Sequence, residues 1–522
     1  MRNLIRKEIK RLSAKAFLKK KAILAAEEKY REKFRRRTGI DPIIPDVKSE
    51  SFVHKHFDPA HCKRNANVIA TAIWKKILNL DYKPQPAQLF EVPKVDGSKR
   101  QIMAFGIPDA ALANVLLRIT LERNKKRLSP HSYAYHPDKN VFDAIIAIND
   151  FDNDGKLFVV QIDFQRFFDN IPSNYLKKKI NDMSSISLTK HEKHIFQAFM
   201  HHQYASKSEY VLNSFKKRVR GTPQGSSVSL ILANIANHDL DRKLAAEAGK
   251  FVRFADDVVA VCGTYEEAQR LERCFDRHCQ ESGLVINRVK SPGIAIHTDY
   301  IQEMRSISDF TYLGYSFDAN GLAMPWKTSQ KLRQKISRLI NIYLLNALKF
   351  GFNISRASTE KNYDWDLLGL IYEIRRGLYG GLTEDNINKF IYGGKRLPKM
   401  RGLMGYYCLI EDPKLLKSLD GWMINCVRRA VVERNRRLKN IYGAGCPTPS
   451  DKELIIGSWL DRNAWRDKNE GKNDHVEVAL PSLIRGWRAA RKHFFTYGLQ
   501  DVQAPGYNSS MDIASLFDVL EY

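Results

Sequence analysis

The sequence has few cysteines and lacks long apolar runs. Its seven cysteines are scattered, and none forms a Cys-x-x-Cys pair. This spacing excludes a zinc ribbon or a disulfide framework and favours thiols kept reduced in a cytoplasm. No apolar run approaches the roughly 20 residues of a membrane span, and no secretory leader pattern is present. We therefore expect a cytoplasmic protein with no membrane partner.

Acidic residues are scarce relative to basic ones. The 522 residues include 85 Lys and Arg against 58 Asp and Glu, which gives a net charge of +27. Such an excess is unusual for a metabolic enzyme and favours a polyanionic partner, of which nucleic acid is the first candidate. The length predicts two or three domains, and neither internal repeats nor low-complexity tracts interrupt it.

The chain changes character twice along its length. Residues 1–45 combine many Lys and Arg with apolar residues at helical spacing, which predicts a basic amphipathic helix that lies on nucleic acid. A mixed α/β region follows, from about 50 to 320. Beyond Trp326, basic helical patterns dominate and an all-α region is expected. The strand-like runs of the middle region are 88–93, 157–164, 251–262 and 310–317.

Two segments place acids inside apolar strands. Asp163 ends the run that starts at 157, and Asp256 and Asp257 interrupt the run 251–262. An ionised carboxylate in such surroundings is costly unless a cation compensates its charge. Mg²⁺ prefers oxygen ligands, and two such ions hold the attacking and leaving oxygens in nucleotidyl transfer. We expect Asp163 and Asp256 to be shared metal ligands, supported by Asp257.

A glycine-bounded loop separates these acids in the sequence. Residues 220–229 read RGTPQGSSVS and lead into the apolar helical stretch 230–235. Glycine lets a backbone approach a ligand closely, and the start of a helix favours an anion. An ordinary loop with a serine N-cap is the alternative interpretation.

The order of these segments resembles the reverse transcriptase family, in particular its bacterial branch near group II intron and retron enzymes. The resemblance implies an α/β (α+β) right-hand polymerase fold: a basic N-terminal helix (1–45), fingers and palm with an antiparallel sheet (46–322), a helical thumb (323–400) and a basic α-helical, RNA-binding C-terminal region (401–522). Seven ordered segments carry it: VPKVDGSKRQI (92–102), SYAYHPDKNVFDAI (132–145), QIDFQRFFDNI (161–171), GTPQGSSVSLILANI (221–235), FADD (254–257), GLVINRVKS (283–291) and FTYLGYSF (310–317).

The resemblance implies catalytic roles at matching positions. Asp163, Asp256 and Asp257 would be the catalytic, metal-binding acids, with Phe164 as a further contact of metal and substrate. Lys290 would protonate the pyrophosphate leaving group, with a plain surface lysine as the alternative.

The resemblance also implies positions that bind the incoming nucleotide. Phe168 would clash with a ribose 2′-hydroxyl and so select deoxynucleotides; core packing is its alternative. The expected nucleotide contacts are Gln224 and Gly225, and the expected triphosphate contacts are Lys94, Lys99 and Arg100.

The segment RLPKMRGLMGYYCLIED (396–412) resembles the stretch of group II intron proteins where the thumb meets RNA. Cations and aromatic rings here and further along suit phosphate contact and base stacking. A basic helical face packed by its aromatic side is the alternative. The predicted nucleic-acid contacts are Arg401, Tyr406, Tyr407, Arg428, Arg429, Arg434, Arg436 and Arg437.

The resemblance therefore implies an RNA-directed DNA polymerase that adds dNTPs with two Mg²⁺ ions, for which Mn²⁺ can substitute. A compact polymerase with its own helical extension, and with no endonuclease pattern in view, resembles the defence-associated "unknown group" reverse transcriptases of bacteria. We expect a structured non-coding RNA as template, a cDNA product and a role against phage. A retron or group II intron maturase-type enzyme, a template-independent nucleotidyl transferase and an idle RNA-binding scaffold remain alternatives, and homo-oligomerisation stays open.

Overall fold

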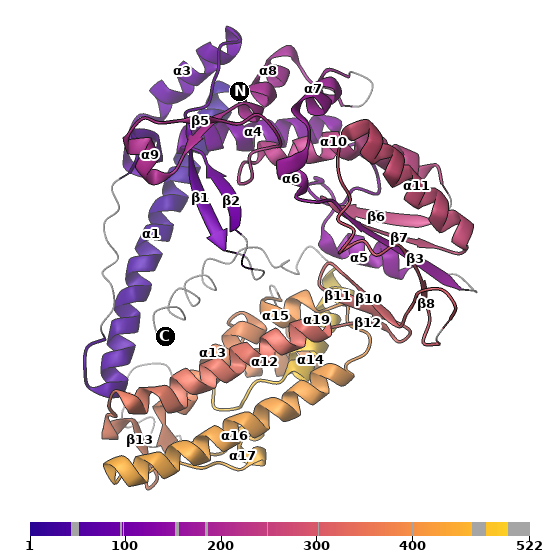
Figure 1. Cartoon of the computed structure of the whole chain (residues 1–522). Helices are drawn as coiled ribbons and strands as arrows, with labels where there is room; N and C mark the ends of the chain where they lie inside the picture. Colours follow the sequence, from indigo (N-terminus) through magenta and orange to yellow (C-terminus); the bar gives the residue numbers. More distant parts are fainter. Residues whose placement is uncertain are drawn as a thin grey trace. The chain divides into compact units, whose positions relative to one another are not determined.

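The computed structural model describes residues 1–42, 52–93, 97, 99–151, 156–182, 186–247, 249–300, 302–397, 400–461 and 477–498. The chain divides into two compact units (Figure 1). The first unit comprises Met1–Lys21 and Lys48–Ser308, and the second comprises Ala22–Val47 and Asp309–Tyr522. The division precedes the expected boundary at 322, and the expected thumb and C-terminal regions fall in a single unit.

The first unit mixes helices and strands, as the sequence predicts. Helix α1 (Arg2–Thr38) begins in this unit and ends in the second. The other helices are η1 (Lys55–Phe57), α2 (Pro59–Arg64), α3 (Ala66–Leu78), α4 (Ile107–Asn124), α5 (Val141–Asn149), α6 (Phe167–Asn170), α7 (Ser173–Asn181), α8 (Lys190–Met200), α9 (Lys207–Val211), α10 (Val228–Ala245) and α11 (Tyr265–Ser282). The strands are β1 (Ala87–Pro93), β2 (Lys99–Ala104), β3 (Leu157–Asp163), β4 (Gln203–Ala205), β5 (Lys216–Lys217), β6 (Lys250–Phe254), β7 (Asp257–Cys262), β8 (Ile294–His297) and β9 (Ser306–Ile307).

The strands of the first unit form two sheets. One has the order β6-β7-β3-β8-β9, in which β3 is central and antiparallel to both β7 and β8. The apolar side chains of β3 are buried on both faces, which explains why its sequence reads as a continuous apolar run. The other sheet has the order β2-β1-β4-β5. The apolar run 251–262 forms the antiparallel hairpin β6–β7, as expected from placing Asp256 and Asp257 at a hairpin tip.

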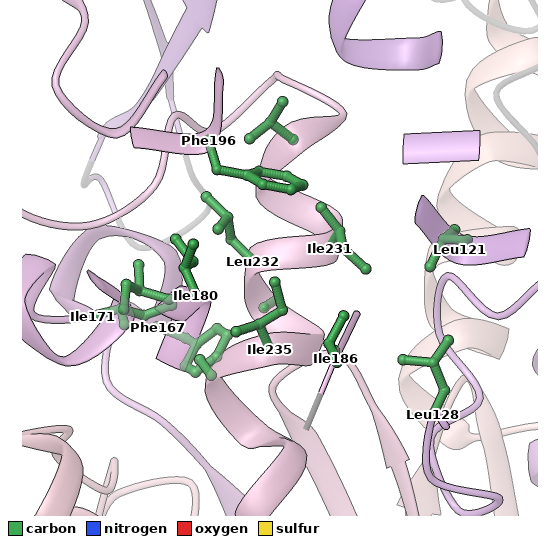
Figure 2. Packing of buried hydrophobic residues seen from close by; sticks show 14 of the residues in the cluster. Leu121, Leu128, Phe167, Ile171, Ile180, Ile186, Phe196, Ile231, Leu232 and Ile235 are labelled. Carbon is green, nitrogen blue, oxygen red and sulfur yellow. The ribbon is translucent and has the colours of Figure 1, made fainter. Parts of the chain in front are cut away.

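Helix α10 is the centre of the first unit's core. It is apolar around most of its circumference and packs against α4, α7, α11 and β6. Figure 2 shows Ile231, Leu232 and Ile235 of this helix among side chains from neighbouring elements, including Phe167 and Phe196. The helix begins directly after the glycine-bounded loop, so the buried core fixes where that loop ends.

The second unit is mainly helical. Its strands are β10 (Asp309–Tyr312), β11 (Tyr315–Asp318), β12 (Gly321–Ala323), β13 (Ala357–Ser358) and β14 (Tyr363–Asp364). Its helices are α12 (Trp326–Ile340), η2 (Asn341–Leu345), η3 (Asn346–Lys349), η4 (Ile354–Arg356), α13 (Trp365–Tyr379), α14 (Glu384–Gly393), α15 (Gly402–Tyr406), α16 (Lys414–Tyr442), α17 (Asp451–Ile456) and α19 (Leu483–Tyr497). Over the described ranges of both units, none of the helices has the length and apolar character needed to span a bilayer.

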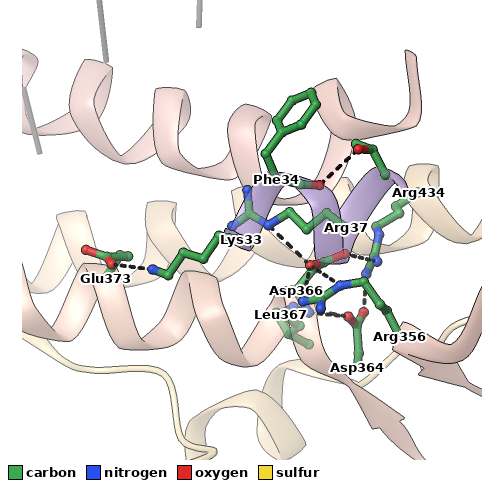
Figure 3. Close-up of polar contacts among 10 residues, drawn as sticks. Lys33, Phe34, Arg37, Arg356, Asp364, Asp366, Leu367, Glu373 and Arg434 are labelled. Atoms are coloured by element: carbon green, nitrogen blue, oxygen red, sulfur yellow. Dashed lines mark hydrogen bonds and ion pairs between the residues drawn. The ribbon is translucent and has the colours of Figure 1, made fainter. Parts of the chain in front are cut away.

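A buried network of charges organises the second unit (Figure 3). Arg434 of α16 forms ion pairs with Asp364 and Asp366, and both partners are buried with it. Asp366 also pairs with Arg356 and with Arg37 near the end of α1. The last turns of α1 are therefore held by protein contacts, and a second pair, Lys33 with Glu373, reinforces them in Figure 3.

Candidate active site

Strand pairing brings the predicted acids together at one end of the five-stranded sheet. β3 ends at Asp163, whose register partner across the ladder is Asp257, the first residue of β7. Phe254 pairs directly with Asp257, so only Ala255 and Asp256 form the turn between β6 and β7. Ala255 adopts a left-handed backbone with φ +63°, which is uncommon for a residue with a side chain. All three acids therefore lie at the same strand ends.

The acids crowd one another electrostatically. Burial, together with the charges of Asp163 and Asp256, raises the pKa of Asp257 to about 7. Burial and Asp163 also raise the pKa of Asp256, although Lys290 and Arg100 act in the opposite direction. Nζ of Lys290 lies 2.8 Å from Oδ2 of Asp163, and this hydrogen bond raises the lysine pKa. The site therefore holds more negative charge than its cations compensate.

This donor set fits a divalent cation, which would relieve that repulsion. Within the described ranges, no three His, Cys, Asp or Glu side chains are already arranged as a metal cage. Magnesium sites do not require one, because Mg²⁺ is usually bound by one or two carboxylates together with waters and substrate phosphates. Asp163, Asp256 and Asp257 are the side chains that would hold such an ion here.

Phe164 can contribute only through its backbone. Its ring is buried against Phe167, Phe275 and His278. The adjacent bridge to Ile286 uses main-chain groups of the residues flanking Phe164, which places the Phe164 carbonyl on the β7 side of β3. The predicted contact of Phe164 with metal and substrate stays a prediction, and only its backbone carbonyl could make it.

The glycine-bounded loop is fixed between α6 and β2. Gly221 has φ +75°, and a Cβ added there would lie 2.6 Å from the carbonyl oxygen of Phe168. Only glycine fits this approach. The side-chain amide of Gln224 donates to Asp169 at 3.3 Å, and the backbone carbonyl of Gln224 accepts from the backbone N–H of Met103 at 2.7 Å. The loop thus joins the segment after β3 to the β1–β2 hairpin.

Phe168 combines both interpretations that the sequence allows. Its ring is half-buried and makes an edge contact with Phe167, at 5.4 Å between ring centroids. It packs on the edge of the core and keeps an exposed side. This geometry is compatible with a gate beside Asp163, and the role in sugar selection stays a prediction.

The expected triphosphate contacts have different environments. Lys99 is exposed and pairs with Glu91 on the neighbouring strand at 2.7 Å. Arg100 is also exposed, and its charge opposes the rise in the pKa of Asp256 that burial causes. Lys94 lies outside the described residues. Gly225 is exposed beside β2, where an added Cβ would lie 2.9 Å from the carbonyl oxygen of Met103.

Sequence reasoning missed a buried arginine next to the acids. Arg253 of β6 is fully buried and makes a two-pronged ion pair with Asp241 of α10. The main chain of Arg253 pairs with that of Ser132. Tyr135 follows in the same segment, and burial together with the charge of Asp256 raises its pKa. The signal was present as a lone arginine inside an apolar strand, which requires a buried partner.

Three of the predicted nucleic-acid contacts are instead structural. Arg434 is 1% exposed and held by Asp364 and Asp366, so it cannot reach RNA. Tyr407 is also buried, and its hydroxyl donates to the carbonyl of Gly314 at 3.1 Å.

Tyr406 serves the same turn. Its hydroxyl donates to the carbonyl of Leu313, next to Gly314 in the tight β10–β11 turn. The hydroxyls of Tyr406 and Tyr407 thus satisfy consecutive carbonyls that the turn leaves without strand partners. The other predicted contacts retain exposure, and they are Arg401, Arg428, Arg429, Arg436 and the half-buried Arg437.

Comparison with known proteins finds a family match for the middle of the chain. Residues 92–317 match the family model described as "Reverse transcriptase (RNA-dependent DNA polymerase)". This stretch contains the strand-end acids, the glycine-bounded loop and the fingers hairpin. This stretch is therefore similar to reverse transcriptases, and the mixed α/β architecture expected for it is confirmed.

Among curated proteins, relatives are yeast intron proteins. The "Uncharacterized 91 kDa protein in cob intron" of Schizosaccharomyces pombe is 26% identical over 41% of this chain and 33% of its own length. The "Putative COX1/OXI3 intron 2 protein" of Saccharomyces cerevisiae is 28% identical over 31% of this chain and 18% of its own length. The chain thus spans a third or less of these relatives.

Solved structures with detectable likeness include telomerases. That of Candida albicans, in complex with a fragment of telomeric RNA, has a TM-score of 0.36 and 13% identity over 70% of this chain and 66% of its own. The apo telomerase of Candida tropicalis has a TM-score of 0.38 and 12% identity over 83% of this chain and 68% of its own.

Proposed function

We propose that this chain synthesises DNA on an RNA template from deoxynucleoside triphosphates, with two Mg²⁺ ions at Asp163 and Asp256. The observation that carries the proposal is the pairing of Asp163 with Asp257 at adjacent strand ends, inside the segment matched to the reverse transcriptase family. When bound, the ions would stabilise the charge that develops on the attacking and leaving oxygens.

The chain's own residues would orient the substrate around these acids. Arg100 and Lys99 of the fingers hairpin would bind the triphosphate, and Gln224 and Gly225 would line the nucleotide site next to β2. Lys290 would hold a proton near the leaving pyrophosphate, and its hydrogen bond to Asp163 supports this role.

The direct test replaces Asp256 by asparagine and measures templated dNTP incorporation. A metal ion supplies several kcal/mol of charge stabilisation, so we expect a loss of about 10²-fold or more. Binding of RNA should survive, because Asp256→Asn changes neither the fold nor the basic surface. Asp276→Asn is the matched control, since Asp276 is an exposed acid of α11 paired with Arg288. Full synthesis by Asp256→Asn would refute the two-metal assignment.

The exposed arginines of α16 support an RNA partner. Arg428 and Arg429 are exposed on this helix, and Arg436 follows two turns later. Replacing Arg428 and Arg429 by glutamine should weaken RNA binding and reduce the slope of log affinity against log salt by about 0.7–0.9 for each lost phosphate contact. An unchanged slope would show that these side chains do not contact RNA phosphates.

A maturase-type function is the second candidate, because the curated relatives above are proteins named after introns. The role in bacterial antiphage defence and the non-coding RNA template remain predictions. One experiment separates these uses: the protein is purified from its host, and the RNA and DNA that accompany it are sequenced. Intron RNA would support the maturase, whereas a small structured RNA with a complementary cDNA would support the defence or retron function. Synthesis without any template would favour a nucleotidyl transferase.

A further inference from the structure

All three guanidinium nitrogens of Arg253 donate hydrogen bonds. Its Nε and Nη2 donate to the two carboxylate oxygens of Asp241, both at 2.6 Å. Nη2 also donates to Oγ of Ser132 at 2.9 Å, and Nη1 donates to Oδ1 of Asn234 at 3.4 Å. The remaining contact is from Nη1 to the carbonyl oxygen of Ala255, at 2.9 Å. Arg253 and Asp241 are both buried.

The contact to Ala255 reaches the turn that carries the catalytic acids. Ala255 precedes Asp256 and holds a left-handed backbone, a conformation that an L-residue leaves readily unless its surroundings fix it. The main chain of Arg253 is itself anchored, because its N–H donates to His131 and its carbonyl accepts from Tyr133, each at 2.9 Å. The arginine therefore connects a fixed strand to the strained turn.

The geometry of the contacts is specific to arginine. A planar guanidinium can grip a carboxylate with two parallel bonds while a further N–H points elsewhere, whereas a lysine ammonium lacks this fork. Burial adds to the effect, because hydrogen bonds are stronger where water is excluded.

We propose that Arg253, oriented by Asp241, is a positioning residue that fixes the Ala255–Asp256 turn and thereby the placement of Asp256 and Asp257 for divalent cations. The inference rests on the proposed function for its catalytic meaning. Its effect on cation binding can be measured without nucleotide or template.

The key variant is Arg253→Met combined with Asp241→Leu. Removing both partners of a buried ion pair and filling the space with apolar groups is often neutral for folding, whereas removing one partner is not. The double variant thus deletes the donor to Ala255 and leaves no buried charge behind. Arg253→Lys is the second variant, since it keeps a cation for Asp241 and loses the fork. Asp239→Asn is the control on the same helix, because Asp239 pairs instead with Lys179.

Three quantities are compared with the wild type: the thermal midpoint, Mn²⁺ binding without nucleotide by electron paramagnetic resonance, and kcat and KM for dNTP. For the double variant we expect a midpoint close to wild type, with Mn²⁺ affinity and kcat each lower by about 10–100-fold, as for other residues that orient metal ligands. KM for dNTP should stay unchanged, because the nucleotide contacts lie elsewhere. Arg253→Lys should show a smaller loss, and the control none.

The outcomes separate this inference from the proposed function. A folded double variant with wild-type Mn²⁺ affinity and kcat overturns the inference. Failure of both variants to fold also overturns it, because the network would then serve the fold and not the turn. A wild-type protein that binds Mn²⁺ in a manner dependent on Arg253 yet makes no DNA would refute the proposed function alone.

Discussion

Replacing Arg434 by alanine should destabilise the second unit without touching RNA. Arg434 is 1% exposed, and its Nη2 lies 2.8 Å from Oδ2 of Asp366 while Nη1 pairs with Asp364 (Figure 3). After truncation, Asp366 keeps Arg356 at 2.7 Å, but Asp364 loses its guanidinium. Asp364 also caps α13 by accepting from two backbone N–H groups. The loss of its partner would therefore also destabilise the start of that helix.

Removing one member of a buried pair costs about 3–5 kcal/mol, because it leaves an uncompensated charge in the interior. For a unit of this size, about 2–4 °C of thermal midpoint is lost for each kcal/mol. The transition of the second unit should therefore fall by about 6–20 °C. Replacing Arg434 together with its partners by apolar groups would cost less.

The assay is thermal unfolding of Arg434→Ala beside Arg436→Ala. Arg436 is exposed and pairs with Glu433 on its own helix, so its loss should leave the midpoint unchanged. At a temperature where both variants are folded, Arg434→Ala should bind RNA with the wild-type salt slope. A wild-type midpoint for Arg434→Ala would refute the burial argument, and a flatter salt slope would restore Arg434 as a phosphate contact.

The same network predicts how the variant responds to acid. Burial alone raises the pKa of Asp366, but Arg434, Arg356 and Arg37 more than offset this and lower it. A lowered carboxyl pKa gives stability that is present above the unfolded value of about 3.9 and lost as pH falls through the folded value. Without Arg434 the folded pKa rises, so acid unfolding of the second unit should begin at a higher pH than in the wild type.

Three further substitutions test other parts of the chain. Phe168→Ala should raise the ratio of kcat/KM for ribonucleotides over deoxynucleotides by about tenfold or more, since one steric contact in a pocket is worth about 1–3 kcal/mol; unchanged selectivity would reject the sugar gate. Gly221→Ala should lower the free energy of unfolding by about 1–2 kcal/mol or more, the cost of a left-handed backbone in a residue with a side chain. An unchanged thermal midpoint would show that the loop can move away from α6. Tyr407→Phe should cost about 0.5–1.5 kcal/mol by removing the hydrogen bond to Gly314, measured by chemical denaturation, whereas weaker RNA binding at full stability would favour the original stacking role.

The placement of the acids at strand ends could be predicted because its signal is local. Asp163 and Asp257 each adjoin a run of apolar residues, and such runs become paired, buried strands. Gly221 could be assigned to a tight loop for the same reason, since it lies two residues before a proline in a short segment that leads into a helix. Neither inference needs to know which distant residue is the partner.

The roles of Arg434 and Arg253 depended on distant partners and were missed. Asp364 and Asp241 cannot be matched to them by spacing. For Arg434 a local sign was nevertheless available: it lies on the same helical face as Val427, Val431 and Leu438, the apolar stripe of α16. An arginine on an apolar stripe is more often paired and buried than exposed to a ligand. In the same way, Tyr406 and Tyr407 were predicted to stack on bases because the turn that their hydroxyls contact lies far away in the sequence.

Among the described residues, the carboxylates near Arg434 and those at the strand ends differ in how their charge is compensated. Asp364 and Asp366 are neutralised by guanidinium groups of the protein itself, and the pKa of Asp366 is accordingly low. At the strand ends the pKa values of Asp256 and Asp257 are raised, and Lys290, the cation bonded to this cluster, is a flexible side chain that is 69% exposed. This contrast supports the proposal that the strand-end acids hold a divalent cation, because such an ion would relieve the burial and mutual repulsion that raise their pKa values.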